Sequence, residues 1–140
     1  MGIVVFSIFT LNEKYGIIIG TIISLIIVST LIYFFANSLN EIIIGEKNVT
    51  LKKNIGKIKI PLSDIIKIEK LDFSNLSLTY GSKGVFGYIG NSMDDSISMV
   101  KNRKNMIRII TSEKKYMISS DRPKDLINDL KKVLQVQQIK

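Results

Sequence analysis

In the stretch Asn105–Leu130, NMIRIITSEKKYMISSDRPKDLINDL, the hydrophobic period changes from that of a β-strand to that of an α-helix. This change indicates the fold class. Residues 106–111 and 115–119 are rich in β-branched residues and are separated by three polar residues, which predicts a β-hairpin. The period then becomes helical, with Ser120 or Asp121 as the N-cap. The apolar face of this predicted helix comprises Leu126, Ile127, Leu130, Val133, Leu134 and, at its edge, Gln137. We expect an amphipathic helix over 121–137 that caps a sheet, with adsorption to lipid as the alternative.

The residues before this stretch continue the β-strand pattern. Residues 41–119 consist of short segments that are β-branched or alternate polar and apolar side chains, and turn residues separate these segments. Residues 57–60, KIKI, alternate polar and apolar side chains, and Pro61 then ends the strand or places it at a sheet edge. No helical segment falls between the strands, which disfavours a parallel βαβ sheet. We therefore predict about seven short strands in a curved antiparallel sheet. The segment 81–90, GSKGVFGYIG, is predicted to be a glycine-rich loop.

The N-terminal part of the chain has a different character, since residues 15–40 carry no charged side chain. Residues 15–36 read YGIIIGTIISLIIVSTLIYFFA and would form a helix of roughly 33 Å, close to the ~30 Å hydrocarbon core of a bilayer. We predict a transmembrane helix over 15–37. Two alternatives remain: a core helix, which a ~100-residue remainder could hardly cover on all sides, and a cleaved signal peptide.

The segment before this helix and the lysines after it bear on topology. Residues 1–11, MGIVVFSIFTL, are apolar but too short to span a bilayer alone, so they form either an interfacial stub or part of a membrane hairpin. One lysine precedes the span, whereas five lie between 47 and 59. The positive-inside rule therefore predicts that the C-terminal part faces the cytoplasm. We expect a membrane anchor over 1–40 and a domain over 41–140, located at the cell (inner) membrane.

Composition disfavours most enzyme classes. The 140 residues include no cysteine, histidine or tryptophan, so thiol nucleophiles, thiolate ligands and imidazole bases are absent. Asp94 and Asp95 are adjacent, and neighbouring residues on a strand face opposite sides, so they make a poor metal site. We predict no catalytic residues, no metal and no cofactor.

Three segments resemble the bacterial pleckstrin-homology-like (PH-like) domain proteins with an N-terminal membrane segment. They are Ile58–Ile65 (IKIPLSDI), Gly84–Gly90 (GVFGYIG) and Asn105–Leu130, and the resemblance covers roughly residues 40–135. It implies a seven-strand, two-sheet PH barrel closed at one end by the C-terminal helix, and no enzyme activity. Members of this family often have two apolar spans upstream, of which the first is here shortened to residues 1–11.

Two sets of residues are candidate binding sites. Phe86 and Tyr88 in the glycine-rich segment would contact a protein partner, although glycines there also suit tight backbone geometry alone. A basic set of Lys52, Lys53, Lys57 and Lys59 would contact anionic lipid, although lysines also serve solubility and topology. A second basic cluster is formed by Lys101, Arg103, Lys104 and Arg108.

The formal net charge of +8 does not indicate nucleic-acid binding, because the basic residues are dispersed and no aromatic platform accompanies them. We predict an integral membrane protein that is a non-enzymatic binding or scaffolding module for an undefined protein partner. The alternative is a sensor of anionic lipid headgroups. A cryptic enzyme is the third class considered, and the sequence predicts no oligomeric state.

Overall fold

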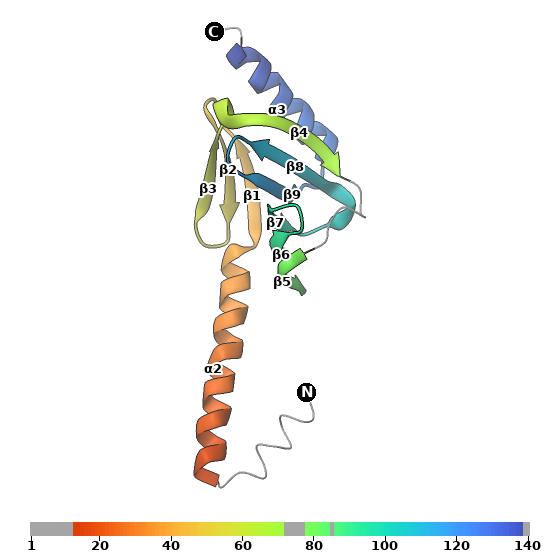
Figure 1. Cartoon of the computed structure of the whole chain (residues 1–140). Coiled ribbons are helices and arrows are strands. Elements are labelled where there is room, and N and C mark those ends of the chain that lie inside the picture. Colours follow the sequence, from red (N-terminus) through yellow and green to blue (C-terminus); the bar gives the residue numbers. More distant parts are fainter. Residues whose placement is uncertain (1–12, 72–77, 85, 139–140) are drawn as a thin grey trace. The chain divides into compact units, whose positions relative to one another are not determined.

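The computed structural model describes residues 13–71, 78–84 and 86–138 (Figure 1). The chain divides into two compact units, residues 1–33 and 34–140. The elements of the described part are helix α2 (Glu13–Asn37), strands β1 (Leu39–Ile44), β2 (Asn48–Lys53), β3 (Lys57–Pro61), β4 (Ile65–Leu71), β5 (Leu78–Gly84), β6 (Gly87–Ser92), β7 (Ser96–Val100), β8 (Met106–Thr111) and β9 (Lys115–Ser119), and helix α3 (Pro123–Gln138). Two 3-10 turns, Leu62–Asp64 and Arg103–Asn105, precede β4 and β8. The expectations for residues 1–11 lie outside the described residues.

Helix α2 supplies the first unit, and its last turn, Phe34–Asn37, belongs to the second. The stretch Tyr15–Asn37 is long and apolar enough to cross a membrane, and none of its most apolar 18-residue window is buried. The hydroxyls of Thr21 and Thr30 donate to helix carbonyls four residues earlier, at 2.8 and 2.7 Å. These bonds satisfy the hydroxyls without water, which suits a lipid environment.

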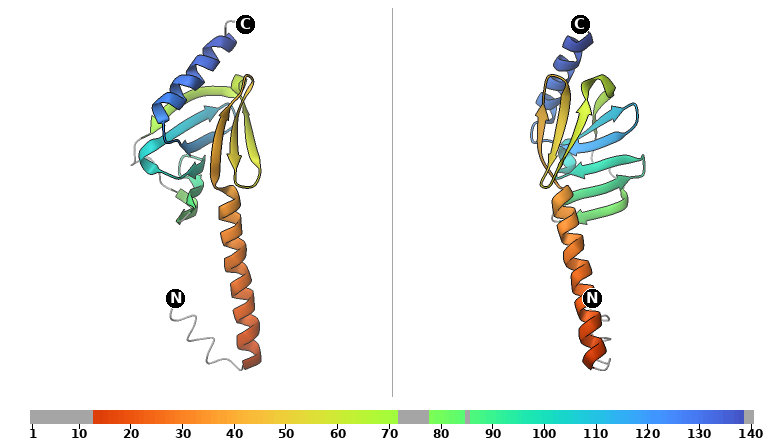
Figure 2. Two further views of the ribbon diagram at one scale, coloured as in Figure 1. Left: turned by 180° about the vertical axis from the view of Figure 1, so that it is seen from behind. Right: turned by 90° about the vertical axis from the view of Figure 1, so that its left-hand side faces the viewer.

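The second unit contains two sheets. Sheet A has the order β1-β2-β3 and sheet B the order β4-β8-β9-β7-β6-β5. Pro61 lies on β3, an edge strand, which is where a residue without an N–H is tolerated. The views in Figure 2 separate the three strands of sheet A from the larger sheet B and show α3 crossing one end of both.

Two details of the sheets differ from the sequence-based expectation. The described part has nine strands rather than about seven, because the glycine-rich segment is not a loop but forms most of β5 and most of β6. The sheet is also not wholly antiparallel, since β7 pairs with β9 in parallel. Residues 101–105 carry the chain past β9, and the Ser119 hydroxyl accepts from the Lys101 N–H at 2.8 Å to hold this crossing.

The main core lies between the two sheets and α3. Its buried side chains include Val49, Leu51, Ile60, Ile107, Ile109, Ile118 and Leu130. Leu130 of α3 is fully buried, and Leu126, Ile127, Val133 and Leu134 pack against the core around it. The predicted mainly β fold capped by a C-terminal amphipathic helix is therefore confirmed. The helix begins at Pro123 rather than at 121, so neither Ser120 nor Asp121 is its N-cap. Proline is tolerated at the first helical position because the N–H that it lacks would have no intrahelical partner there.

The opposite face of sheet B has a smaller apolar cluster formed by Leu71, Val100, Met106 and Met117, with Leu78 and Tyr88 packed against it. Met106 and Met117 are fully buried. Alternate residues of β8 thus supply two different cores, which is why its sequence MIRIIT shows no simple polar–apolar alternation.

Candidate functional site

Three of the four predicted lipid-binding lysines share one face of the β2–β3 hairpin. Lys52 lies opposite Lys57, and Thr50 lies opposite Lys59, so Lys52, Lys57 and Lys59 lie on the same side of sheet A. All three are exposed, whereas Val49, Leu51 and Ile60 of the same strands are buried on the other side. We call Lys52, Lys57 and Lys59 the hairpin lysines. Lys52 forms an exposed ion pair with Glu41 of β1 at 3.5 Å.

The turn of this hairpin, residues 54–56, is hydrogen-bonded to the last turn of α2. The Ile55 N–H donates to the Ala36 carbonyl at 3.0 Å, and the Asn54 N–H donates to the Ser38 carbonyl at 3.0 Å. The Asn54 side-chain amide donates to the Phe35 carbonyl at 3.0 Å. The last carbonyls of a helix have no hydrogen-bond donor within the helix, and here the hairpin turn supplies donors to them. The hairpin turn therefore lies against the end of the apolar helix.

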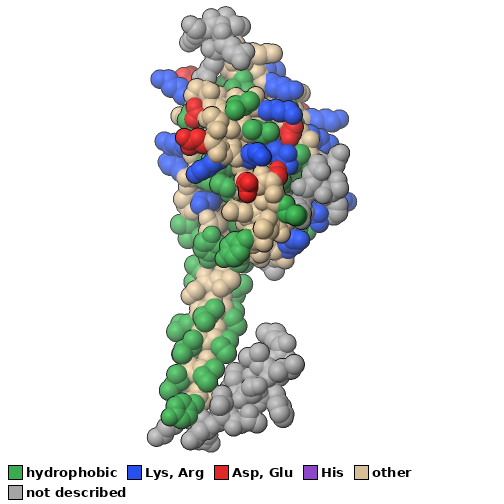
Figure 3. Space-filling view, in the orientation of Figure 1, with side chains coloured by type: hydrophobic (Ala, Val, Ile, Leu, Met, Phe, Trp, Pro, Cys, Tyr) green, Lys and Arg blue, Asp and Glu red, His purple; other side chains and the backbone are tan. Residues whose placement is uncertain are grey.

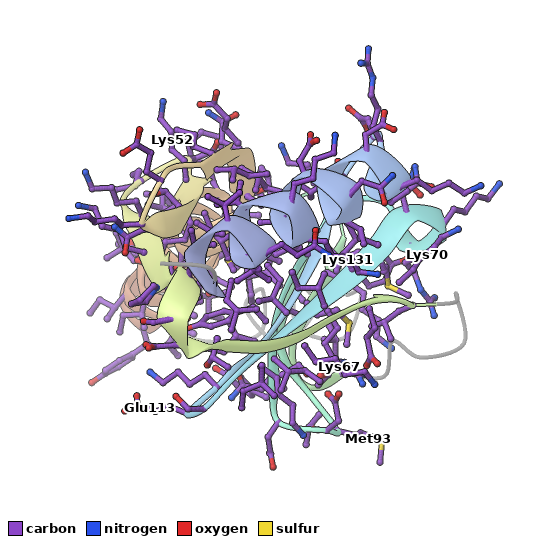
Figure 4. The ribbon with its side chains drawn as sticks, turned by 90° about the horizontal axis from the view of Figure 1, so that it is seen from above. Lys52, Lys67, Lys70, Met93, Glu113 and Lys131 are labelled. Carbon is purple, nitrogen blue, oxygen red and sulfur yellow. The ribbon has the colours of Figure 1, made fainter. Side chains whose placement is uncertain are left out.

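Lys53, the fourth predicted lysine, has a different environment. Its Nζ donates to Asn37 Oδ1 at 2.9 Å, so the side chain is directed to the helix end rather than to the exposed face. Figure 4 shows Lys52 on sheet A, Lys67 and Lys70 on β4, and Lys131 on α3, so the basic residues are spread over separate elements. Figure 3 shows the same dispersion over one face of the second unit.

Phe86, a predicted partner-binding residue, lies in the β5–β6 connection and packs within the second unit. Its ring meets that of Phe35 edge to face, with 5.8 Å between the ring centroids. Its carbonyl accepts a hydrogen bond from the Ser38 hydroxyl at 3.1 Å. Both contacts join the β5–β6 hairpin to the last turn of α2, so Phe86 has a structural role in addition to any contact with a partner.

Tyr88, the second predicted partner-binding residue, packs on the small apolar cluster of sheet B. The guanidinium carbon of Arg103 lies 5.1 Å from the centroid of its ring, which is cation–π geometry. Tyr88 and Phe86 thus point to different neighbours, and the structure does not bring them together as one aromatic surface.

The glycines of β5 and β6 serve backbone geometry. Gly81 and Gly90 are directly opposite each other and have φ of 141° and 147°. A Cβ at Gly81 would collide with the Ile89 carbonyl, and one at Gly90 with the Tyr80 carbonyl. The two backbones approach too closely for any side chain, which accounts for glycine at both positions without a phosphate ligand.

Sequence reasoning missed a polar network on the outer face of sheet B. Arg108 Nη1 lies 3.1 Å from Glu69 Oε1, and its Nη2 lies 2.7 Å from Asp94 Oδ2. Lys67 Nζ lies 2.7 Å from the other oxygen of Glu69. The Arg108 side chain is only 18% exposed. The cross-strand position of Glu69 opposite Arg108 depends on the β4–β8 register, which the sequence does not reveal.

Both carboxylates of this network have lowered pKa values. Hydrogen bonding from Lys67 is the largest cause lowering the pKa of Glu69, with the charges of Lys67 and Arg108 adding to it and partial burial opposing it. Burial is the largest influence on Asp94 and would raise its pKa, but hydrogen bonds from Ser92 and Ser96 and the charge of Arg108 outweigh it. The Ser92 hydroxyl donates to Asp94 Oδ1. The carboxyl groups of Glu69 and Asp94 are therefore ionised at neutral pH.

An open groove of about 610 Å³ lies between the β1–β2 turn and the last turns of α3. Ile44, Val133 and Val136 line it with apolar atoms. Lys47 and Lys132 contribute one basic side chain from each wall, and the remaining lining residues are Gly45 and Glu46. Sequence analysis gave no signal for this groove, because its two walls are separated by most of the domain in sequence.

Among the described residues no group of three or more aspartates and glutamates is placed to hold a metal ion. Asp94, considered in the sequence as half of an acidic pair, instead pairs with Arg108, while Asp95 has a φ of 61° in the tight β6–β7 turn. The described side chains therefore form structural ion pairs here rather than a recognisable metal centre.

Two sheets enclosing a core, closed at one end by an amphipathic C-terminal helix, define a PH-like sandwich. The family described as Bacterial PH domain matches residues 40–134, and the chain belongs to this family. Comparisons with curated proteins and with solved structures returned no match. Domains of the PH-like family are typically non-catalytic.

Proposed function

We propose that the protein is a membrane-anchored, non-enzymatic PH-like module that binds or scaffolds a protein partner at the cytoplasmic face of the cell membrane. The observation that carries the proposal is the uncovered apolar helix Tyr15–Asn37 in front of a bacterial PH domain. A helix of this length and composition is stable in lipid, whereas outside a membrane its apolar side chains would be exposed to water. The lysines that follow it favour the cytoplasmic orientation. Tethering raises the local concentration of the module around other membrane proteins.

The orientation is tested with a single reactive thiol. The chain has no cysteine, so Met93→Cys, at a 74% exposed position, would introduce a unique thiol in the second unit. In intact cells we expect this thiol to resist a membrane-impermeant maleimide and to react once the membrane is permeabilised. Modification in intact cells would contradict a cytoplasmic domain.

The binding role is tested by chemical crosslinking in native membranes. We expect defined neighbours to be recovered with the full chain and not with an anchor that ends at Asn37, because the second unit supplies the contacts. Equal recovery with both chains would mean that the span alone selects the neighbours, which contradicts a binding domain.

The alternative, a sensor of anionic headgroups, is supported by the position of the β2–β3 turn. Its hydrogen bonds to Phe35, Ala36 and Ser38 keep the hairpin beside the end of the predicted span. Basic residues near an anionic leaflet gain about 1 kcal/mol each. The hairpin lysines are exposed. Among the described residues, Glu41 forms an ion pair with one of them, Lys52.

Nanodiscs with and without anionic lipid test this alternative. An environment-sensitive fluorophore on Ile55→Cys reports the surroundings of the turn, since Ile55 is 61% exposed. A sensor would give a spectral shift in anionic discs that Lys52→Glu/Lys57→Glu abolishes and Lys124→Glu/Lys131→Glu on α3 retains. A shift independent of lipid charge would reject headgroup sensing and leave the protein-binding role in place.

A further inference from the structure

The groove between the β1–β2 turn and α3 has the features of a peptide-binding surface. Its volume of about 610 Å³ falls within the range of roughly 300–1,000 Å³ typical of ligand sites. Val136 is 61% exposed although it lies beside the buried part of α3. Val133 is half-buried and joins this exposed valine to the main core. An apolar strip therefore continues from the core to the surface.

Both walls of the groove are fixed by contacts of their own. In the β1–β2 turn, the Gly45 N–H donates to the Asn48 carbonyl at 2.9 Å, and the Leu62 N–H donates to the Lys47 carbonyl at 3.0 Å. The α3 wall is held by Leu130, which is fully buried in the main core. A surface that is already formed loses little conformational entropy when it binds a partner.

The charges beside the apolar strip select the chemistry of the occupant. Lys47 and Lys132 come from opposite walls, so an extended or helical segment in the groove would have a basic residue on each side. Glu46 is the one acidic lining residue, and it already has an interaction within the structure. Apolar side chains that fill the strip and carboxylates that meet the two lysines would complement this surface.

Two other occupants fit less well. A lipid headgroup is anionic, but it would leave the apolar strip of Ile44, Val133 and Val136 without a partner. In a symmetric contact, a second copy would bring the same lysines toward each other, and each copy carries a net charge of +8.

We propose that this groove binds an acidic, apolar peptide segment of a partner protein. The proposal rests on the proposed binding function and identifies its surface and the class of its partner. Val136, Val133 and Ile44 take the apolar side chains of the segment, and Lys47 and Lys132 pair with its carboxylates. None of these residues belongs to the hairpin lysines or to the Phe86 and Tyr88 surroundings.

The experiment uses the full chain in non-ionic detergent micelles and a fluorescein-labelled synthetic peptide of leucines and glutamates arranged for one apolar helical face. Binding is measured by fluorescence polarisation. We expect saturable binding that Lys47→Glu/Lys132→Glu weakens about tenfold or more, since two attractive charges become repulsive. The same variant should gain affinity for a peptide with lysine in place of glutamate. The matched control Lys83→Glu/Lys104→Glu changes the net charge equally at exposed positions away from the groove.

A bulky maleimide on Val136→Cys should block the peptide, and the same group on Met93→Cys should not. Absence of saturable binding up to about 1 mM, equal weakening by both double variants, or dimerisation of the chain through the groove would overturn the proposal. The micelle assay does not depend on orientation or on native neighbours. Its failure is therefore distinguishable from failure of the crosslinking experiment, which tests the proposed function itself.

Discussion

The backbone N–H of Ile55 donates to the carbonyl of Ala36 across 3.0 Å, so the turn of a β-hairpin caps the C-terminus of the apolar helix. The adjacent Phe35 carbonyl accepts from the Asn54 side chain. Phe35 and Ala36 of the last turn of α2 thus belong to the same compact unit as the β2–β3 hairpin.

Asn54→Ala removes the side-chain donor of this cap. We expect a loss of about 0.5–1.5 kcal/mol and faster hydrogen exchange of the Ile55 amide, because the turn is released from the helix end. Exchange of the full chain in micelles, followed by mass spectrometry, measures the effect. Asn128→Ala, at an exposed position on α3, is the control and should leave the Ile55 amide protected. Unchanged exchange in Asn54→Ala would mean that the side-chain bond contributes nothing.

Alanine at Gly81 or Gly90 should be severely destabilising. Each Cβ would collide with a backbone carbonyl of the neighbouring strand, and each φ lies in a region that side chains rarely adopt. We expect losses of more than about 3 kcal/mol or failure to fold, against less than about 1 kcal/mol for Gly84→Ala in the same strand, where the nearest atom is a side-chain oxygen at 3.6 Å. Urea unfolding in micelles compares the three variants, and similar stabilities would refute the role of close strand approach.

Arg108→Met leaves the carboxylates of Glu69 and Asp94 without their shared partner. We expect the free energy of unfolding to fall by about 1–3 kcal/mol at neutral pH, because the shared partner of two partly buried carboxylates is removed. Arg122→Met, at an exposed position, should change the free energy of unfolding by almost nothing. Thermal unfolding followed by circular dichroism provides the comparison, and equal effects would show that the network does not stabilise the fold.

The same network predicts a dependence of stability on acid. The folded-state pKa values of Glu69 and Asp94 lie below the ordinary values of these carboxyl groups, 4.5 and 3.8. These two carboxylates therefore contribute their full stabilisation at pH values above the ordinary pKa values. This stabilisation is lost as the pH falls through the lower folded-state pKa values. We expect the melting temperature to drop below about pH 4.5 and the drop to be smaller in Arg108→Met. A steeper drop in that variant would contradict the assigned cause.

Leu130→Ala tests the attachment of α3. The side chain is fully buried in the main core, so its truncation should cost about 2–5 kcal/mol. Val136→Ala, two turns nearer the C-terminus and 61% exposed, should change stability little. Chemical denaturation in micelles measures both, and a small effect of Leu130→Ala would mean that α3 does not close the core.

Local sequence patterns were enough to predict the apolar helix, the β-rich character of the domain, the β8–β9 hairpin and the capping helix. Each of these follows from local periodicity: an uninterrupted apolar run, alternation by two, or the 3.6-residue stripe around Leu130. Pro61 was also placed correctly at the end of an edge strand, because proline has no N–H to donate to a neighbouring strand.

The pairing of the strands, by contrast, follows from long-range packing. The parallel β7–β9 pair, the opposed Gly81 and Gly90, and the pairing of Arg108 with Glu69 and Asp94 depend on register and strand order, which single-chain periodicity does not encode. The same holds for the groove, whose lysines, Lys47 and Lys132, lie far apart in the chain and share one groove only because α3 packs on the core beside the β1–β2 turn. Local patterns specify which face of an element is apolar, whereas long-range packing selects the partner of that face.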